Sequence, residues 1–251
     1  FDTKKAIFRS EIDRGHNSYR KDLRLKLKRS NIFQGSFVQL MSKPTDELRG
    51  SLYIEYEDEF GQDAGGLTRD WFQTISQEIF NRDYALFNLS TSGNTYQPSS
   101  LSYVNGEHLQ YFKFVGRVIG KALFEDQLIG AYFTRSFYKL ILGEDLQLKD
   151  LEEQDQAKYK GLQYYLENPL FDEQYFVYAS PHFEEVKEKE LVPGGSTLLV
   201  TEENKAEWVK RTAEFIMRDE ILPQITSFLE GLHELIPADS LALLDSRELE
   251  L

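Results

Sequence analysis

The sequence predicts an α+β fold that is mainly helical, with a small α+β unit inserted near the end of a larger helical unit. Three observations predict it: an apolar stripe that repeats every 3.6 residues over 107–123, two strand-like patterns within residues 23–57, and a change of composition after Gly143. The expected boundaries place residues 1–151 and 218–251 in the large unit and residues 152–217 in the small unit.

Local periodicity predicts the elements of the large unit in order. Leucines at every second position of 23–27 alternate with basic residues, which is typical of a half-exposed strand. Small residues beside the long stripe, among them Gly116 and Gly120, indicate close approach of a neighbouring helix. The other expected elements are a helix from Asn31 with Ser30 as a cap, a strand at 52–57, a helix entered through Gly65-Gly66 and running to Ile79, a helix over 133–141, and a helix over 220–235 with Pro223 in its first turn.

The small unit shows shorter and more mixed signals. A helix is expected over 158–167 and a strand over 175–179, paired with 198–200 after the turn at Pro193-Gly194-Gly195. Thr201 is a candidate cap for the helix that carries Trp208.

Composition limits the possible classes of protein. The chain has 251 residues, of which 41% are hydrophobic and 28% charged, an ordinary globular composition. No apolar run approaches the roughly 18 residues that a membrane helix needs, and the first residues lack the apolar stretch of a signal peptide. We therefore expect a soluble protein of the cytoplasm and/or nucleus with no membrane partner.

Side-chain chemistry predicts no catalytic group and no metal or other cofactor. Cysteine is absent, which excludes disulfides, thiolate metal sites and a cysteine nucleophile within this chain. The four histidines, His16, His108, His182 and His233, are widely separated. The loop Gly61–Gly66 lacks the spacing of a phosphate-binding loop and is better explained as a tight turn into a helix. These patterns favour a binding module.

Charge is unevenly distributed along the chain. The net charge is −13, yet residues 1–30 carry ten Lys and Arg against four acidic residues, and residues 144–190 carry thirteen Asp and Glu against five Lys. Such runs are most often solvated faces. The basic residues of the first segment alternate along a strand and the chain as a whole is acidic, so no nucleic-acid partner is expected.

Several motifs resemble a known family, in the same order along the chain. They are Phe1–Lys5, Leu52–Tyr56 leading into Gly61–Phe72, Tyr84–Phe87, His108–Arg117, Tyr132–Lys139 and Val200–Lys205. Together they resemble the N-terminal lobe of HECT-type ubiquitin-protein ligases, and within that family the Huwe1/Tom1-like branch. The resemblance covers essentially the whole chain.

The resemblance implies a transferase whose N-terminal lobe docks a ubiquitin-conjugating enzyme. A smaller C-terminal lobe carries the cysteine that accepts ubiquitin and passes it to a substrate lysine. Residues 245–251 resemble the run that precedes the hinge to that lobe, so this chain alone is expected to bind the partner without accepting ubiquitin. Protein substrates would be recruited through regions outside the chain. A non-catalytic adaptor that keeps only the docking lobe is the alternative.

The resemblance also assigns candidate contact residues. Leu162, Leu166, Phe176 and Trp208 would line the groove for the conjugating enzyme, and Thr212 matches a groove position where relatives tend to carry leucine or tyrosine. Leu162 and Leu166 are one helical turn apart and share a face. The competing explanation is that these residues are the small unit's own core. A second, non-covalent ubiquitin would bind the large unit near 90–100, with Tyr96 and Tyr103 as aromatic anchors.

Overall fold

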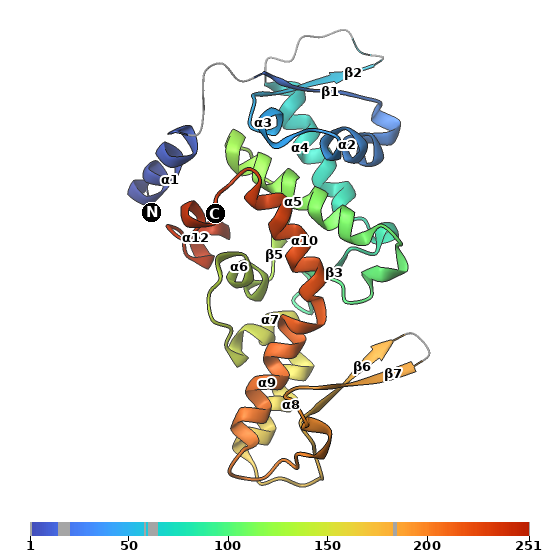
Figure 1. The fold of residues 1–251 in the computed structure, drawn as a ribbon, viewed down its shortest axis with the longest axis vertical. Helices are drawn as coiled ribbons and strands as arrows, with labels where there is room; N and C mark the ends of the chain where they lie inside the picture. The colour runs from blue at the N-terminus through green and yellow to red at the C-terminus, as the bar shows by residue number, and fades with distance from the viewer. Residues whose placement is uncertain (1, 15–20, 58, 60–64, 183–184, 251) are drawn as a thin grey trace.

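The computed structural model describes residues 2–14, 21–57, 59, 65–182 and 185–250. They form an elongated molecule in which a large unit and a small unit lie end to end, with the small unit at the lower end of the view (Figure 1). The chain enters the small unit after α6 and returns to the large unit before α10. The mainly helical α+β fold predicted from the sequence is confirmed. His16 and residues 61–64 lie outside the described residues.

The large unit contains most of the helices. Its elements are α1 (Asp2–Arg14), β1 (Leu23–Leu27), η1 (Arg29–Asn31), α2 (Ile32–Met41), α3 (Thr45–Leu48), β2 (Leu52–Tyr56), α4 (Gly66–Ile79), η2 (Arg82–Tyr84), β3 (Phe87–Leu89), β4 (Thr95–Pro98), η3 (Ser102–Val104), α5 (His108–Glu125), β5 (Tyr132–Phe133), α6 (Arg135–Leu142), α10 (Leu222–His233), α11 (Ala238–Leu241) and α12 (Ser246–Glu250). The helix α1 has no counterpart among the sequence predictions.

The small unit and its connections contain the remaining elements. These are η4 (Leu148–Asp150), α7 (Leu151–Gln154), α8 (Gln156–Glu167), β6 (Val177–His182), β7 (Glu185–Glu190), η5 (Gly195–Thr197), α9 (Lys205–Met217) and η6 (Asp219–Ile221). In Figure 1, α9 and α10 follow one another along the long axis of the molecule, with the hairpin β6–β7 projecting to one side.

The strands of the described residues form three small sheets. β1 and β2 pair in parallel from Leu23 opposite Leu52, and the leucines of β1 are buried while the residues between them are exposed. The predicted half-exposed strand is therefore confirmed. β4 lies between β3 and β5, so the region 90–100, near which a second ubiquitin is expected, contains a strand.

The helices α5 and α10 form the centre of the large unit. They approach closely because glycine faces backbone on both sides: a Cβ on Gly116 would lie 2.0 Å from the Phe228 carbonyl oxygen, and a Cβ on Gly231 would lie 2.0 Å from the Lys113 carbonyl oxygen. The close approach predicted from the small residues is confirmed. Pro223 occupies the first turn of α10, as predicted.

Each unit has its own apolar core. One cluster of buried side chains runs from Phe8 to Leu241 and fills the large unit, without members between Ile141 and Ile221. The second contains Leu151, Leu162, Phe176, Trp208 and their neighbours, and ends at Met217. Leu146 and Leu148 also pack against it, so side chains before residue 152 contribute to the small unit's core.

The strands of the small unit differ from the sequence prediction. β6 pairs with β7, while Tyr175 and Leu199 form only a single bridge. The strand β7 escaped notice because its side chains are mostly charged and, from Val186 on, exposed, which leaves no apolar alternation to detect.

Two of the expected helix caps are wrong. Asn204, not Thr201, precedes α9, and the Asn204 side-chain oxygen accepts a hydrogen bond from the Thr201 backbone N–H at 2.7 Å. Ser30 lies within the short helix η1 and does not cap α2, which starts after Asn31.

Candidate functional site

The candidate docking residues lie in the small unit, and most of them are interior. Leu162, Phe176, Trp208 and Thr212 are all buried, and the Thr212 hydroxyl donates to the Trp208 carbonyl oxygen one turn earlier on α9, at 2.8 Å. Leu166, one turn from Leu162 on α8, is 39% exposed. Geometry therefore brings the residues together around one core, and of the five only Leu166 is open to a partner.

A row of aromatic rings leads from that core to the surface. The ring of Tyr165 packs edge-on against Trp208, with centroids 5.0 Å apart, and stacks on Phe171 at 5.2 Å. The ring of Tyr164 also packs edge-on against Phe171, with centroids 5.7 Å apart. Phe171 is 65% exposed and Tyr164 52% exposed. A buried tryptophan is thus connected through stacked rings to two aromatic side chains that face solvent.

Sequence reasoning missed Tyr164 and Phe171. Tyr164 lies on α8, on a different face from the Leu162–Leu166 pair, and Phe171 lies in an irregular segment where no periodicity exists. The available signal was the concentration of aromatic residues over 159–178, which is high for a segment expected to be solvated.

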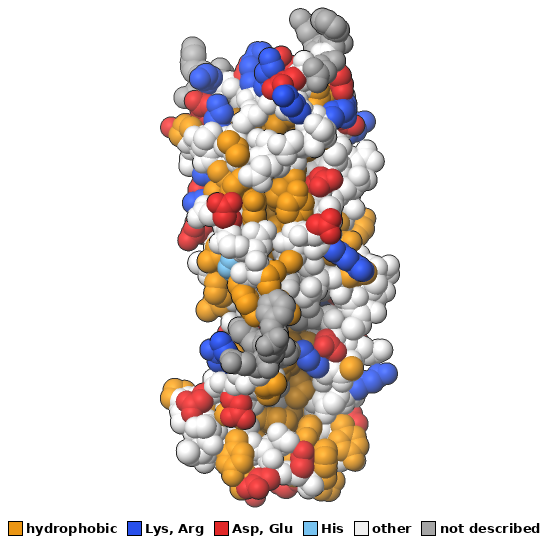
Figure 2. Space-filling view, turned by 90° about the vertical axis from the view of Figure 1, so that its right-hand side faces the viewer, with side chains coloured by type: hydrophobic (Ala, Val, Ile, Leu, Met, Phe, Trp, Pro, Cys, Tyr) orange, Lys and Arg blue, Asp and Glu red, His pale blue; other side chains and the backbone are white. Residues whose placement is uncertain are grey.

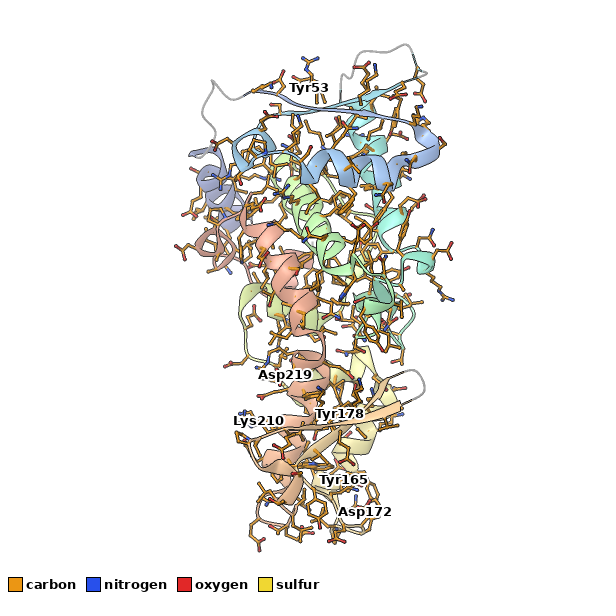
Figure 3. The ribbon with its side chains drawn as sticks, turned by 45° about the vertical axis from the view of Figure 1, so that its right-hand side comes forward. Tyr53, Tyr165, Asp172, Tyr178, Lys210 and Asp219 are labelled. Atoms are coloured by element: carbon orange, nitrogen blue, oxygen red, sulfur yellow. The ribbon has the colours of Figure 1, made fainter. Side chains whose placement is uncertain are left out.

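The aromatic row is fixed by polar contacts at its base. The Tyr165 hydroxyl donates to the Asp172 carboxylate at 3.1 Å, and the two residues lie side by side at the lower end of the molecule (Figure 3). Burial and the hydrogen bond to Asp172 raise the pKa of Tyr165 above its ordinary value. The Gln174 amide also donates to Asp172, at 2.7 Å.

A separate groove lies between α9 and residues 146–148, with Leu166 of α8 at its edge, and no residue of the aromatic row lines it. It encloses about 330 Å³. Its walls are largely apolar and include Leu146, Leu148, Leu166, Val209, Ala213 and Met217. Figure 2 shows hydrophobic side chains gathered over this lower end of the molecule, with acidic side chains among them. Such a mixture is typical of a protein-binding surface.

The turn before α9 is held by a carboxylate. Glu190 accepts hydrogen bonds from the backbone N–H groups of Gly194 and Ser196, both at 3.1 Å, and from the Ser196 hydroxyl at 2.6 Å. These bonds lower the pKa of Glu190. Leu198 and Leu199, which follow this turn, are both exposed.

Trp208 carries an unsatisfied donor. Within the described part of the chain, its indole N–H is buried and has no hydrogen-bond acceptor. Such a group costs roughly 1–3 kcal/mol.

Charges near the N-terminal strand are largely paired. Lys26 lies 3.5 Å from Glu55 and Lys28 lies 3.4 Å from Glu57, across the two strands. Arg24 lies over the ring of Tyr53, on the outer face at the upper end of the molecule (Figure 3). The basic run that stands out in the sequence is therefore neutralised within its own sheet.

The two candidate ubiquitin anchors come from different elements. Tyr96 lies on β4, half-buried, with its ring 4.4 Å from that of Phe80. Tyr103 lies on η3 and is exposed. Tyr96 is thus largely occupied by packing inside the large unit, and Tyr103 is the more accessible of the two.

The described residues include no group of three His, Asp or Glu side chains placed to hold a metal ion. None of their helices is both long enough and apolar enough to span a membrane.

Comparison with known proteins identifies relatives over the whole chain. Residues 73–251 match the family model of the HECT domain (ubiquitin-transferase). The chain is 42% identical to the E3 ubiquitin-protein ligase UPL2 of Arabidopsis thaliana, 41% identical to HUWE1 of Mus musculus and 38% identical to TOM1 of Saccharomyces cerevisiae. Each match covers 100% of this chain but only 6% to 8% of the relative.

Proposed function

The chain belongs to the HECT-domain (ubiquitin-transferase) family, and we propose that it is the part of a ubiquitin-protein ligase that docks the ubiquitin-conjugating enzyme. The relatives named above are E3 ubiquitin-protein ligases, and the match to them extends over the whole of this chain. The docking surface that we propose is the exposed aromatic end of the small unit, formed by Tyr164 and Phe171 with Tyr165 stacked beneath Phe171.

One observation carries this proposal: the aromatic row from Trp208 through Tyr165 to Phe171. A solvent-facing aromatic ring supported by stacked rings beneath it is already ordered, so little side-chain entropy is lost when a partner covers it. Burial of such a ring stabilises a complex by roughly 1.5–3 kcal/mol, enough for a hot spot in a transient interface.

The chemistry of transfer must be completed by another part of the ligase. Ubiquitin arrives on the conjugating enzyme as a thioester, and accepting it as a new thioester requires a thiolate. This chain has no cysteine. We therefore propose that its role is to bind and orient the charged conjugating enzyme, while a cysteine outside these 251 residues accepts ubiquitin.

The proposal is tested by calorimetric titration of the chain with several ubiquitin-conjugating enzymes. Phe171→Ala removes the exposed ring and is expected to weaken binding by about 2 kcal/mol or more, roughly thirtyfold in Kd. Val186→Ala is the matched control, because Val186 is equally exposed in the same unit but lies on the hairpin strand β7. It should bind like the parent chain.

Two outcomes contradict the proposal. Absence of binding by the parent chain to every conjugating enzyme tried would overturn the docking function. Binding that Phe171→Ala leaves unchanged would overturn the assigned surface.

A further inference from the structure

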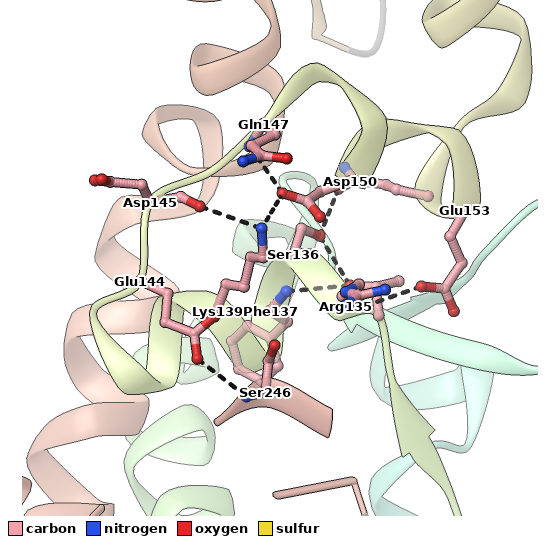
Figure 4. Close-up of polar contacts among 12 residues, drawn as sticks. Arg135, Ser136, Phe137, Lys139, Glu144, Asp145, Gln147, Asp150, Glu153 and Ser246 are labelled. Atoms are coloured by element: carbon pink, nitrogen blue, oxygen red, sulfur yellow. Dashed lines mark hydrogen bonds and ion pairs between the residues drawn. The ribbon is translucent and has the colours of Figure 1, made fainter. Parts of the chain in front are cut away.

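The short helix α7 (Leu151–Gln154) contacts both units, and it contacts each unit through different side chains. Leu151 is fully buried in the apolar core of the small unit. The neighbouring polar residues Asp150, Glu153 and Gln154 contact the large unit instead (Figure 4). The apolar side chain of this helical turn is therefore buried in the small unit, and the polar side chains beside it are hydrogen-bonded to the large unit.

Glu153 makes the most extensive of these contacts. One carboxylate oxygen accepts from the Thr95 hydroxyl on β4 at 2.7 Å, and the other accepts from the Arg135 backbone N–H at the start of α6 at 3.0 Å. The Glu153 carbonyl oxygen accepts from the Thr91 hydroxyl. A single residue thus connects α7 to two separate elements of the large unit.

The residues on either side of Glu153 reinforce this attachment. Asp150 accepts from the Lys139 ammonium group of α6 at 2.7 Å, and both side chains are largely buried. Gln154, also buried, accepts from the Ser136 hydroxyl at 3.1 Å. Hydrogen bonds to charged groups in partly buried sites are among the stronger ones, so the attachment has a defined geometry.

The second connection alone would not fix the angle between the units. α9 continues through η6 into α10, with Met217 in the small core and Ile221 in the large core. The helical path is broken at Arg218, whose backbone angles of φ −126° and ψ −59° are not helical, so this connection can bend and rotate at that residue. The contacts of α7 lie away from this connection. They attach the small unit to the large unit at a second point and so restrict the rotation.

We propose that Glu153 is a positioning residue for ubiquitin transfer. It sets the orientation of the small unit on the large unit, and so the direction in which a bound conjugating enzyme presents its thioester. This inference rests on the proposed docking function. Because Phe171 and Glu153 lie in different parts of the small unit's framework, loss of Glu153 should leave the affinity for the conjugating enzyme intact and slow the transfer step.

The test compares Glu153→Gln with Glu152→Gln. Glutamine keeps the shape of glutamate but places an N–H₂ group against one of the two donors. Glu152 carries the same charge on the same helix, and its ion pair is to Lys149 of the adjoining turn η4, so Glu152→Gln is the matched control. Thr95→Val, with Thr95→Ser as its conservative counterpart, probes the same hydrogen bond from the large unit.

Three measurements are made on each variant. Residual dipolar couplings of the 251-residue chain report the relative orientation of the units, calorimetry reports the Kd for the conjugating enzyme, and single-turnover discharge of charged conjugating enzyme by the full-length ligase reports transfer. For Glu153→Gln and Thr95→Val we expect altered orientation, a Kd unchanged within about twofold, and discharge slowed about tenfold. Glu152→Gln and Thr95→Ser should behave like the parent.

The possible failures are distinguishable. If the parent chain binds no conjugating enzyme, the docking function fails, while the couplings still test the role of Glu153 in orientation. Unaltered couplings in Glu153→Gln would overturn the inference at its structural step. Altered couplings with discharge at the parental rate would overturn the positioning role.

Discussion

Gly116 on α5 lies against the backbone of Phe228 on α10, so close that a Cβ on Gly116 would come 2.0 Å from the Phe228 carbonyl oxygen. No side-chain rearrangement relieves that overlap, because the obstructing atom belongs to the backbone of a buried helix. The large unit is built around this contact: both helices carry many of its buried aromatic and aliphatic residues.

Gly116→Ala is expected to destabilise the large unit strongly. The two helices must separate to admit one methyl group, which costs packing along their whole contact and, by comparison with other overpacked cores, about 1–3 kcal/mol or more. Chemical denaturation would measure the loss. Gly161→Ala on α8 is the control, because a Cβ there meets no atom within 4 Å, and it should be neutral or slightly stabilising. Equal stability of the two variants would contradict the close helix contact.

Acid should loosen the turn that Glu190 holds. The pKa of Glu190 is lowered below its ordinary 4.5 by the Ser196 hydroxyl and by the N–H groups of Ser196 and Gly194. The stabilisation is therefore fully present above about pH 4.5 and is lost as the pH falls through the lower folded-state pKa. Hydrogen exchange of the Gly194 and Ser196 amides at decreasing pH, corrected for intrinsic rates, should show this loss. Glu190→Gln should remove the pH dependence; protection that is identical in both forms would contradict the assignment.

The large unit was predictable where local periodicity determines burial. The alternation at 23–27 and the 3.6-residue stripe of α5 each identify a buried face without knowledge of what covers it. By contrast, α1 carries only Phe8 and Ile12 as buried hydrophobic residues, too few to form a stripe, and it is stabilised by contacts with distant parts of the chain such as α11.

The candidate docking residues show why a shared helical face is an incomplete guide. Leu162 and Leu166 share a face of α8, yet the first is buried and the second is exposed. The difference is set by which distant side chains pack over each position, which no spacing in the sequence reveals. Likewise, the role of Glu153 depends on Thr95 and Arg135, which are brought to it only by the tertiary fold.

Trp208→Ala should unfold the small unit and leave the large unit folded. Trp208 is only 5% exposed, within a core separate from that of the large unit. Removing a buried tryptophan side chain costs about 3–5 kcal/mol, a large share of the stability of a small core. Hydrogen exchange should show lost protection in α8 and α9 but not in α5. Lys210→Ala, on the same helix with an exposed side chain, is the control. Retained protection in α8 would show that the tryptophan is peripheral to that core.

Association with the conjugating enzyme should slow as salt is added. Acidic side chains surround the proposed docking surface, among them the exposed Glu167 and Glu173. A partner that presents a basic face to this surface would be steered to it, because opposite charges accelerate encounter more than they strengthen the final complex. At about 0.15 M salt the screening length falls to about 8 Å, so the acceleration should be largely lost in that range.

Stopped-flow association rates measured across a range of ionic strength would test this. Glu173→Gln should lower the rate at low salt and flatten its salt dependence, with a smaller effect on dissociation. Glu230→Gln makes the same charge change on α10 of the large unit, where the exposed carboxylate lies near Lys113, and should leave the rates unchanged. A salt-independent association rate, or equal effects of the two variants, would show that the acidic surface does not steer the partner.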